Sequence, residues 1–276
     1  MKRDTFAPGK IILSGEYAVV FGYPGIALPI ALGIEASFED DPSRSSVGIK
    51  ADGPILEYAM RVIKVLENHI EHGGILTIHS NLPFGRGLGS STALVVSITR
   101  ALCGENARAI AESVEKEFNP DASGIDFETI WGNGSIVFKK GAPFLPSPLA
   151  LDTLRGALLI DTGLPNESTA ELVAWMQTRK AEIDPYLQKI ASCTERILNN
   201  EPLPVVLRDH HAAQVALGVV PPLVEKLISD IETVGGAAKA VGAGARTGGA
   251  GMVLALGPSQ EIRSIATRAN MPVIEL

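Results

Sequence analysis

Three glycines at alternate positions, set directly before an apolar stretch, constrain the fold of this chain more than any other feature. The segment reads Pro83-Phe84-Gly85-Arg86-Gly87-Leu88-Gly89-Ser90-Ser91. Alternate glycines allow a tight turn and a close approach of the backbone to a ligand. The helix predicted to begin at Ser90 or Ser91 would present unpaired N–H groups and a partial positive charge. The segment therefore predicts either a phosphate-binding loop or a glycine turn closed by a serine N-cap.

The spacing excludes two common nucleotide-binding motifs. No Gly-Lys-Ser or Gly-Lys-Thr closes the loop, as a Walker loop requires, and the glycines do not have the dinucleotide-binding spacing. A serine hydroxyl at the start of the helix could bind a metal ion or could cap the helix, and the residues alone leave both interpretations open.

The composition indicates a folded protein and excludes several classes of partner. Hydrophobic residues make up 46% of the 276 residues, which is enough for the core of one large or two modest domains. The net charge is −7 and no Lys/Arg block is present, unlike in a non-specific nucleic-acid binder. The apolar runs at 27–32 and 251–257 are too short to span a membrane, and the first residues do not read as a signal peptide. We therefore expect a cytoplasmic protein without nucleic-acid or membrane partners.

Two pairs of potentially reactive residues receive structural interpretations. Cys103 and Cys193 lie in helix-like apolar patterns, where two free thiols are favoured over a lone disulfide. His210 and His211 begin a helical stretch that has no further ligands at metal-binding spacing. We interpret these histidines as surface or structural residues.

Hydrophobic periodicity predicts an α+β protein in two halves. Because Pro143, Pro146 and Pro148 make 140–152 the best linker, we predict domains at 1–148 and 149–276. The strands are predicted at 10–14, 17–21, 26–40, 75–79, 134–139, 156–161, 237–241, 252–256 and 272–275. The helices are predicted at 55–66, 90–103, 106–118, 168–199 with a break near Asp184-Pro185, 204–217, 221–233 and 259–268.

Three motifs in a fixed order give the chain a family resemblance. The pattern Pro-x-Gly-x-Gly-Leu-Gly-Ser-Ser-x-Ala at 83–93 resembles the second signature of the GHMP kinases. Residues 7–24, with Pro8-Gly9-Lys10 and Gly15-Glu16-Tyr17, resemble the first signature, and residues 242–251 resemble the third. The resemblance spans essentially the whole chain. It implies a two-domain fold, ribosomal-protein-S5-like in the N-terminal half and ferredoxin-like in the C-terminal half.

Closer matches are similar to the mevalonate kinase branch of this superfamily. Ser123-Gly124-Ile125-Asp126 resembles that branch's catalytic segment, and Asp161-Thr162-Gly163 resembles its Asp-Thr-Gly segment. Phosphomevalonate kinases usually carry a Trp before Thr-Gly, so Asp161 favours the mevalonate side. Tyr17 stands where mevalonate kinases usually have His. Gly-Glu-Tyr is also seen in phosphomevalonate kinases, which remain the first alternative. A non-catalytic ligand sensor is a weaker alternative, because Lys10 and Asp126 are both present.

The resemblance implies a role for each matched residue, with ATP, Mg²⁺ and mevalonate as the small-molecule partners and a homodimer as one conceivable assembly. Asp126 would accept the hydroxyl proton and Lys10 would stabilise the transferring phosphate, while Ser91 and Glu115 would bind Mg²⁺. By residue type alone, a solvated, capping or turn residue is the favoured interpretation of each of these, whereas Arg246 could equally reach a phosphate or point to solvent. The ATP-binding residues would be Pro83, Gly85, Arg86, Gly87, Leu88, Gly89, Ser90 and Ser91, and the acceptor would contact Glu16, Tyr17, Thr169 and Gly244.

Overall fold

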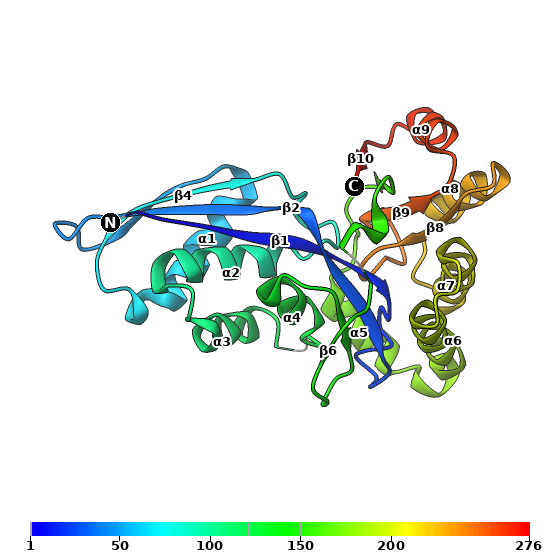
Figure 1. Cartoon of the computed structure of the whole chain (residues 1–276), viewed down its shortest axis with the longest axis horizontal. Helices are drawn as coiled ribbons and strands as arrows, with labels where there is room; N and C mark the ends of the chain where they lie inside the picture. The colour runs from blue at the N-terminus through cyan, green and yellow to red at the C-terminus, as the bar shows by residue number, and fades with distance from the viewer. Residues whose placement is uncertain (1, 121, 150) are drawn as a thin grey trace. The chain divides into compact units, whose positions relative to one another are not determined.

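The computed structural model describes residues 2–120, 122–149 and 151–276, and it divides into two compact units (Figure 1). The first unit holds the chain up to Lys10 together with Pro29–Gly85 and Gly89–Asn133. The second holds Ile11–Leu28, Arg86–Leu88 and Gly134–Leu276. This division differs from a single boundary after residue 148, because the first two strands run through both units. The predicted domain boundaries stay a prediction.

In the first unit, helices pack on strands of one mixed sheet. The strands are β1 (Lys2–Ser14), β2 (Gly25–Asp40), β3 (Val47–Lys50) and β4 (Gly74–Ser80), with β2 antiparallel and β3 parallel to β4. The helices are α1 (Gly53–Leu66), η1 (Glu67–His69), α2 (Ser90–Cys103), α3 (Arg108–Phe118) and α4 (Ile125–Gly132). Helix α2 is apolar on nearly every side and is accordingly almost entirely buried. The hydroxyl of Thr5 on β1 donates to Ser97 O of α2 at 2.9 Å, which ties helix to strand.

In the second unit, a four-stranded antiparallel sheet and a group of helices form two cores. The sheet has the order β10 (Val273–Glu275), β7 (Leu158–Asp161), β9 (Met252–Leu256), β8 (Ala237–Ala240). Helices α8 (Pro222–Thr233) and α9 (Ser259–Arg268) pack on it, while α5 (Thr169–Gln177), α6 (Lys180–Leu198) and α7 (Leu203–Leu217) share a second core. Three short elements complete the unit, namely β5 (Ile136–Phe138), β6 (Leu145–Pro146) and η2 (Leu151–Leu154). Strand β5 pairs with the start of β2 and with β6.

The α+β prediction is confirmed, and two local predictions are wrong. Residues 17–21, predicted as a strand, form turns, with Tyr17 at a φ of 62° and Val20 N bonded to Tyr17 O. The helical break lies at residues 178–179 rather than at Asp184-Pro185. Helix α6 tolerates Pro185 near its start, where the proline removes one backbone hydrogen bond. Strands β3 and β6 and helix α4 are too short to have been recognised from periodicity.

Two predictions from composition can also be compared with the structure. Cys103 is half-buried and Cys193 is buried, and both are free thiols, as predicted. Over the described ranges, helices long and apolar enough for a membrane span are absent.

Candidate active site

Lys10 and Asp126, the two predicted catalytic residues, lie together in the first unit. Lys10 Nζ is 3.1 Å from Asp126 Oδ1, and the side chains are 3% and 35% exposed, respectively. Lys10 belongs to a buried run of β1, and Asp126 lies in the first turn of α4. The N-terminal end of a helix favours a carboxylate. The pair therefore presents a shielded cation next to a carboxylate that remains open to a ligand.

The last glycine of the predicted phosphate loop packs against the side chain of Lys10. Gly89 has a φ of +76°, and a Cβ built there would lie 3.0 Å from Lys10 Cγ and 2.9 Å from Ile130 Cδ1. Only glycine fits this approach without displacing the lysine stem. The end of the loop and the predicted catalytic lysine are therefore parts of one packed arrangement.

The two serines of the loop have different surroundings. Ser90 Oγ accepts a hydrogen bond from Gly85 N at 3.1 Å, which closes the loop on itself. Gly89 holds the N-cap position of α2, so the interpretation of a serine N-cap is wrong. Ser91 is half-buried and hydrogen-bonds the hydroxyl of Tyr58. Burial raises the pKa of Tyr58 to about 12, and the negative charge of Glu115 adds to the increase.

Glu115, the predicted metal ligand, is buried on α3 beside the start of α2. Its Oε1 accepts hydrogen bonds from Thr92 Oγ1 at 2.9 Å and from Asn119 Nδ2 at 3.0 Å. Its Oε2 is buried and has no hydrogen-bond partner among the described residues. Burial raises the pKa of Glu115, as does, more weakly, the charge of Asp126. An unpaired buried carboxylate oxygen is costly, and a cation would satisfy it.

The middle of the glycine loop belongs to the second unit, where it meets the third glycine motif. A Cβ at Gly87 would lie 2.6 Å from Val241 O, and Arg86 O accepts from Met252 N at 3.1 Å. Arg86 Nε donates to both carboxylate oxygens of Asp161, at 2.7 and 2.9 Å. The guanidinium predicted to face ATP therefore already holds a carboxylate, and its contact with ATP stays a prediction.

Glu16 and Tyr17, two of the predicted acceptor residues, are buried in the second unit. Glu16 forms an ion pair with Lys239, and its Oε2 lies 3.1 Å from His210 Nε2. The Tyr17 hydroxyl donates to Ala243 O, and burial raises the pKa of Tyr17, with the charge of Glu16 adding to it. Sequence reasoning missed Lys239, although a lysine inside the apolar strand Ala237–Ala240 is itself a signal. The sequence predicts His210 to be either a surface or a structural residue. Its side chain is buried, so the structural interpretation holds and the surface interpretation does not.

Thr169 and Gly244, the remaining predicted acceptor residues, have surroundings that their positions in the local structure explain. Thr169 is exposed at the start of α5, where its neighbour Ser168 forms a capping box with Glu171. Gly244 has a φ of +60°, and a Cβ there would lie 2.3 Å from Val219 O. Their contacts with an acceptor stay predictions. Arg246 is exposed and stacks over the Trp175 ring at 4.6 Å.

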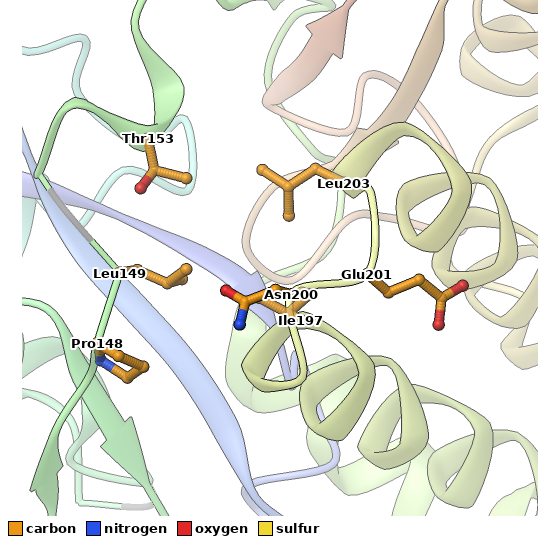
Figure 2. A pocket seen from close by; sticks show the side chains of 7 residues that line it. All are labelled: Pro148, Leu149, Thr153, Ile197, Asn200, Glu201 and Leu203. Carbon is orange, nitrogen blue, oxygen red and sulfur yellow. The ribbon is translucent and has the colours of Figure 1, made fainter.

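The second unit also contains a pocket of about 320 Å³ (Figure 2). Its lining residues come from other parts of the sequence than the residues described above. The pocket is lined by the segment before β7, the last turn of α6, the connection that follows and the first residue of α7. It contains none of the predicted site residues, and its Glu201 is paired with Arg196. The lining residues are Pro148, Leu149, Thr153, Ile197, Asn200, Glu201 and Leu203.

Comparisons with known proteins cover most of the chain. Residues 57–127, which include the glycine loop and Asp126, match the GHMP kinases N terminal domain. The mevalonate kinase of Archaeoglobus fulgidus is 31% identical, with 86% of this chain and 88% of that protein covered. The mevalonate kinase of Pyrococcus abyssi is 29% identical, covering 95% and 90%. The crystal structure of Methanococcus jannaschii mevalonate kinase has the same fold, with a TM-score of 0.79, 20% identity and coverage of 99% and 97%.

Proposed function

The chain belongs to the mevalonate kinase family, and we propose that it transfers the γ-phosphate of ATP to the primary alcohol of mevalonate, giving 5-phosphomevalonate. One observation carries the proposal. The buried Lys10 lies 3.1 Å from Asp126, and its stem packs against the last glycine of a helix-linked glycine loop. A base, a cation and a phosphate cradle are what phosphoryl transfer to an alcohol requires.

Each group has a chemical role in this proposal. Asp126 is partly open to solvent and would accept the hydroxyl proton of the acceptor. Lys10 would stabilise the negative charge that develops on the transferring phosphate, with little reorganisation because its side chain is already fixed. Backbone N–H groups at the start of α2 would hold the phosphate oxygens.

Mg²⁺ is part of the proposal, and the residues present fit it. The unpaired Oε2 of Glu115 and the hydroxyl of Ser91 are hard oxygen ligands, which Mg²⁺ prefers. Mg²⁺ is usually held by one or two carboxylates together with substrate phosphates, so a small set of protein ligands is expected. When bound, Mg²⁺ would supply positive charge beside the phosphates of ATP.

Glu115→Gln tests the metal site. We expect the Mg²⁺ concentration for half-maximal activity to rise by about tenfold or more, because a ligand is lost. Thermal stability should stay the same or rise, because a neutral amide replaces a buried carboxylate with one unpaired oxygen. The measurements are Mg²⁺ titrations of ADP release and thermal melts. Glu117→Gln, at an exposed position of the same helix, is the matched control. An unchanged Mg²⁺ titration for Glu115→Gln would contradict the ligand role.

The preference for mevalonate over phosphomevalonate rests on the charges that surround the acceptor segments. A phosphate site normally gathers Lys and Arg, yet residues 16–24 and 161–169 contain neither. Two cations that do contact these segments are already paired, Arg86 with Asp161 and Lys239 with Glu16. An additional phosphate dianion therefore lacks an evident counter-charge there.

We expect kcat/KM for mevalonate to exceed that for phosphomevalonate by at least about tenfold, a difference of about 1.4 kcal/mol. A coupled ADP-release assay over a panel of alcohols measures both values on one enzyme preparation. Faster turnover of phosphomevalonate would assign the chain to that alternative and would make Tyr17, rather than Asp161, the informative residue.

A further inference from the structure

Three ionisable side chains form a network inside the second unit. Glu16, His210 and Lys239 have side-chain exposures of 1%, 0% and 0%. Glu16 Oε1 contacts Lys239 Nζ, and Glu16 Oε2 lies 3.1 Å from His210 Nε2. The three residues come from different parts of the unit, namely the turn after β1, helix α7 and strand β8.

Stability alone does not account for such a network. Well-packed apolar residues of similar volume are often as stabilising as a buried ion pair, or more so. Burial by itself would raise the pKa of Glu16, yet the charge of Lys239 and the contact with His210 together outweigh burial and lower this pKa to about 2. Burial, followed by the charge of Lys239, lowers the pKa of His210. The network is therefore a carboxylate and an ammonium with a neutral imidazole.

Lys239 holds one short chain segment at two points. Its Nζ donates to Ile12 O at 3.1 Å and also contacts the Glu16 carboxylate. Ile12 lies two residues after Lys10 in β1, and Glu16 directly precedes Tyr17. A single buried ammonium thus fixes both ends of the connection between the catalytic lysine and the predicted acceptor residue Tyr17.

The backbone of this connection needs to be held. Tyr17 has a φ of 62°, which is rare for a bulky residue, and Gly15 has a φ of 116°. A Cβ at Gly15 would lie 2.4 Å from Gly25 Cα, so this turn is also tightly packed. Unfavourable backbone conformations persist only where surrounding contacts impose them, and they cluster at functional sites. Here the imposed conformation brings the Tyr17 hydroxyl to Ala243 O in the third glycine motif.

We propose that Lys239 is a positioning residue for phosphoryl transfer, because its ammonium fixes Ile12 and Glu16 and thereby the strand position of Lys10 and the orientation of Tyr17. The inference rests on the proposed kinase function and extends it to a residue whose side chain is fully buried. It explains why an expensive buried charge is placed in β8, three residues before the third glycine motif.

Lys239→Met tests the inference, because methionine keeps most of the volume and removes the charge and the hydrogen bonds. Well below the melting temperature, we expect kcat to fall by at least about tenfold while KM for ATP stays within roughly threefold of wild type. Lys226→Met, at an exposed lysine of α8 that pairs with Asp230, is the matched control and should keep full activity. A lowered melting temperature with unchanged kcat would show a purely structural role and would overturn the proposal.

The double variant Glu16→Gln/Lys239→Met separates charge burial from positioning. It removes both charges, so its stability should recover relative to Lys239→Met, while kcat should stay low because Ile12 O is still not held. Recovery of wild-type kcat would overturn the proposal. If neither Lys239 variant folds, Glu16→Gln alone decides: a lowered kcat with near-normal KM values supports positioning, and an unchanged kcat overturns it.

The same assays separate this inference from the proposed function. The comparison uses whichever alcohol the wild-type enzyme phosphorylates. A wild-type enzyme that ignores mevalonate contradicts the proposed substrate, whereas a loss of kcat in Lys239→Met with any accepted alcohol still supports the positioning role.

Discussion

Asp126→Asn is expected to lower kcat by about 10²–10⁴-fold, the range typical of a positioned acid–base group, while ATP binding survives. The substitution is nearly isosteric and removes the charge and the proton acceptor next to Lys10 Nζ. Asp126 is 35% exposed, so a hydroxyl can reach it, and it lies outside the glycine loop that would hold the phosphates. Single-turnover phosphorylation and a nucleotide-binding titration, both well below the melting temperature, measure the two effects separately.

The matched control for this prediction is Glu128→Gln. Glu128 lies in the same first turn of α4 and pairs with Arg108 at 2.6 Å, so the control makes the same charge change on the same helix. We expect its kcat to stay within roughly threefold of wild type. If Asp126→Asn also retained activity to within about tenfold of wild type, Asp126 would not be the base.

Local signals predicted the helices well because those signals are complete within one stretch of sequence. Helix α2 was predicted at its observed bounds, since the glycine loop marks its start and Gly104 follows its end. Helix α9 was predicted equally well. The turn at residues 17–21 was misread as a strand, because its apolar residues face the helical core of the second unit rather than a sheet.

The candidate catalytic pair required the family resemblance. Neither the lysine after Pro8-Gly9 nor the aspartate after Gly124-Ile125 carries a local pattern that links it to the other. The structure supplies the physical reason for their pairing: β1 and the start of α4 meet beside the last glycine of the loop. Asp126 and Lys10 as catalytic groups stay predictions until the variants are measured.

The buried network around Lys239 could not be predicted from this single sequence. The sequence predicts Glu16 at the acceptor and His210 as a surface or structural residue. The contact between Glu16 and Lys239 joins residues 223 positions apart, and periodicity carries no information on such a separation. The division of the chain into discontinuous units has the same origin, because β1 and β2 each contribute residues to both units.

Lys10→Met is expected to lower kcat by about 10²–10³-fold, the loss typical of removing one preorganised group that stabilises transition-state charge. Methionine preserves the apolar stem that packs against Gly89, so the glycine loop should keep its conformation. We therefore expect ATP affinity and thermal stability to change far less than turnover, which pre-steady-state kinetics, nucleotide titration and thermal melts would check.

Lys10→Arg distinguishes charge from fit at the same position. A Cβ at Gly89 would already lie 3.2 Å from Lys10 Cε, so the larger, planar guanidinium has little room beside the loop. Arginine should therefore restore the positive charge without restoring turnover. If Lys10→Met stayed within about tenfold of wild type, transition-state charge would have to be stabilised elsewhere. If Lys10→Arg were fully active, a positive charge alone would suffice, and the close contact between Gly89 and the lysine stem would serve folding rather than catalysis.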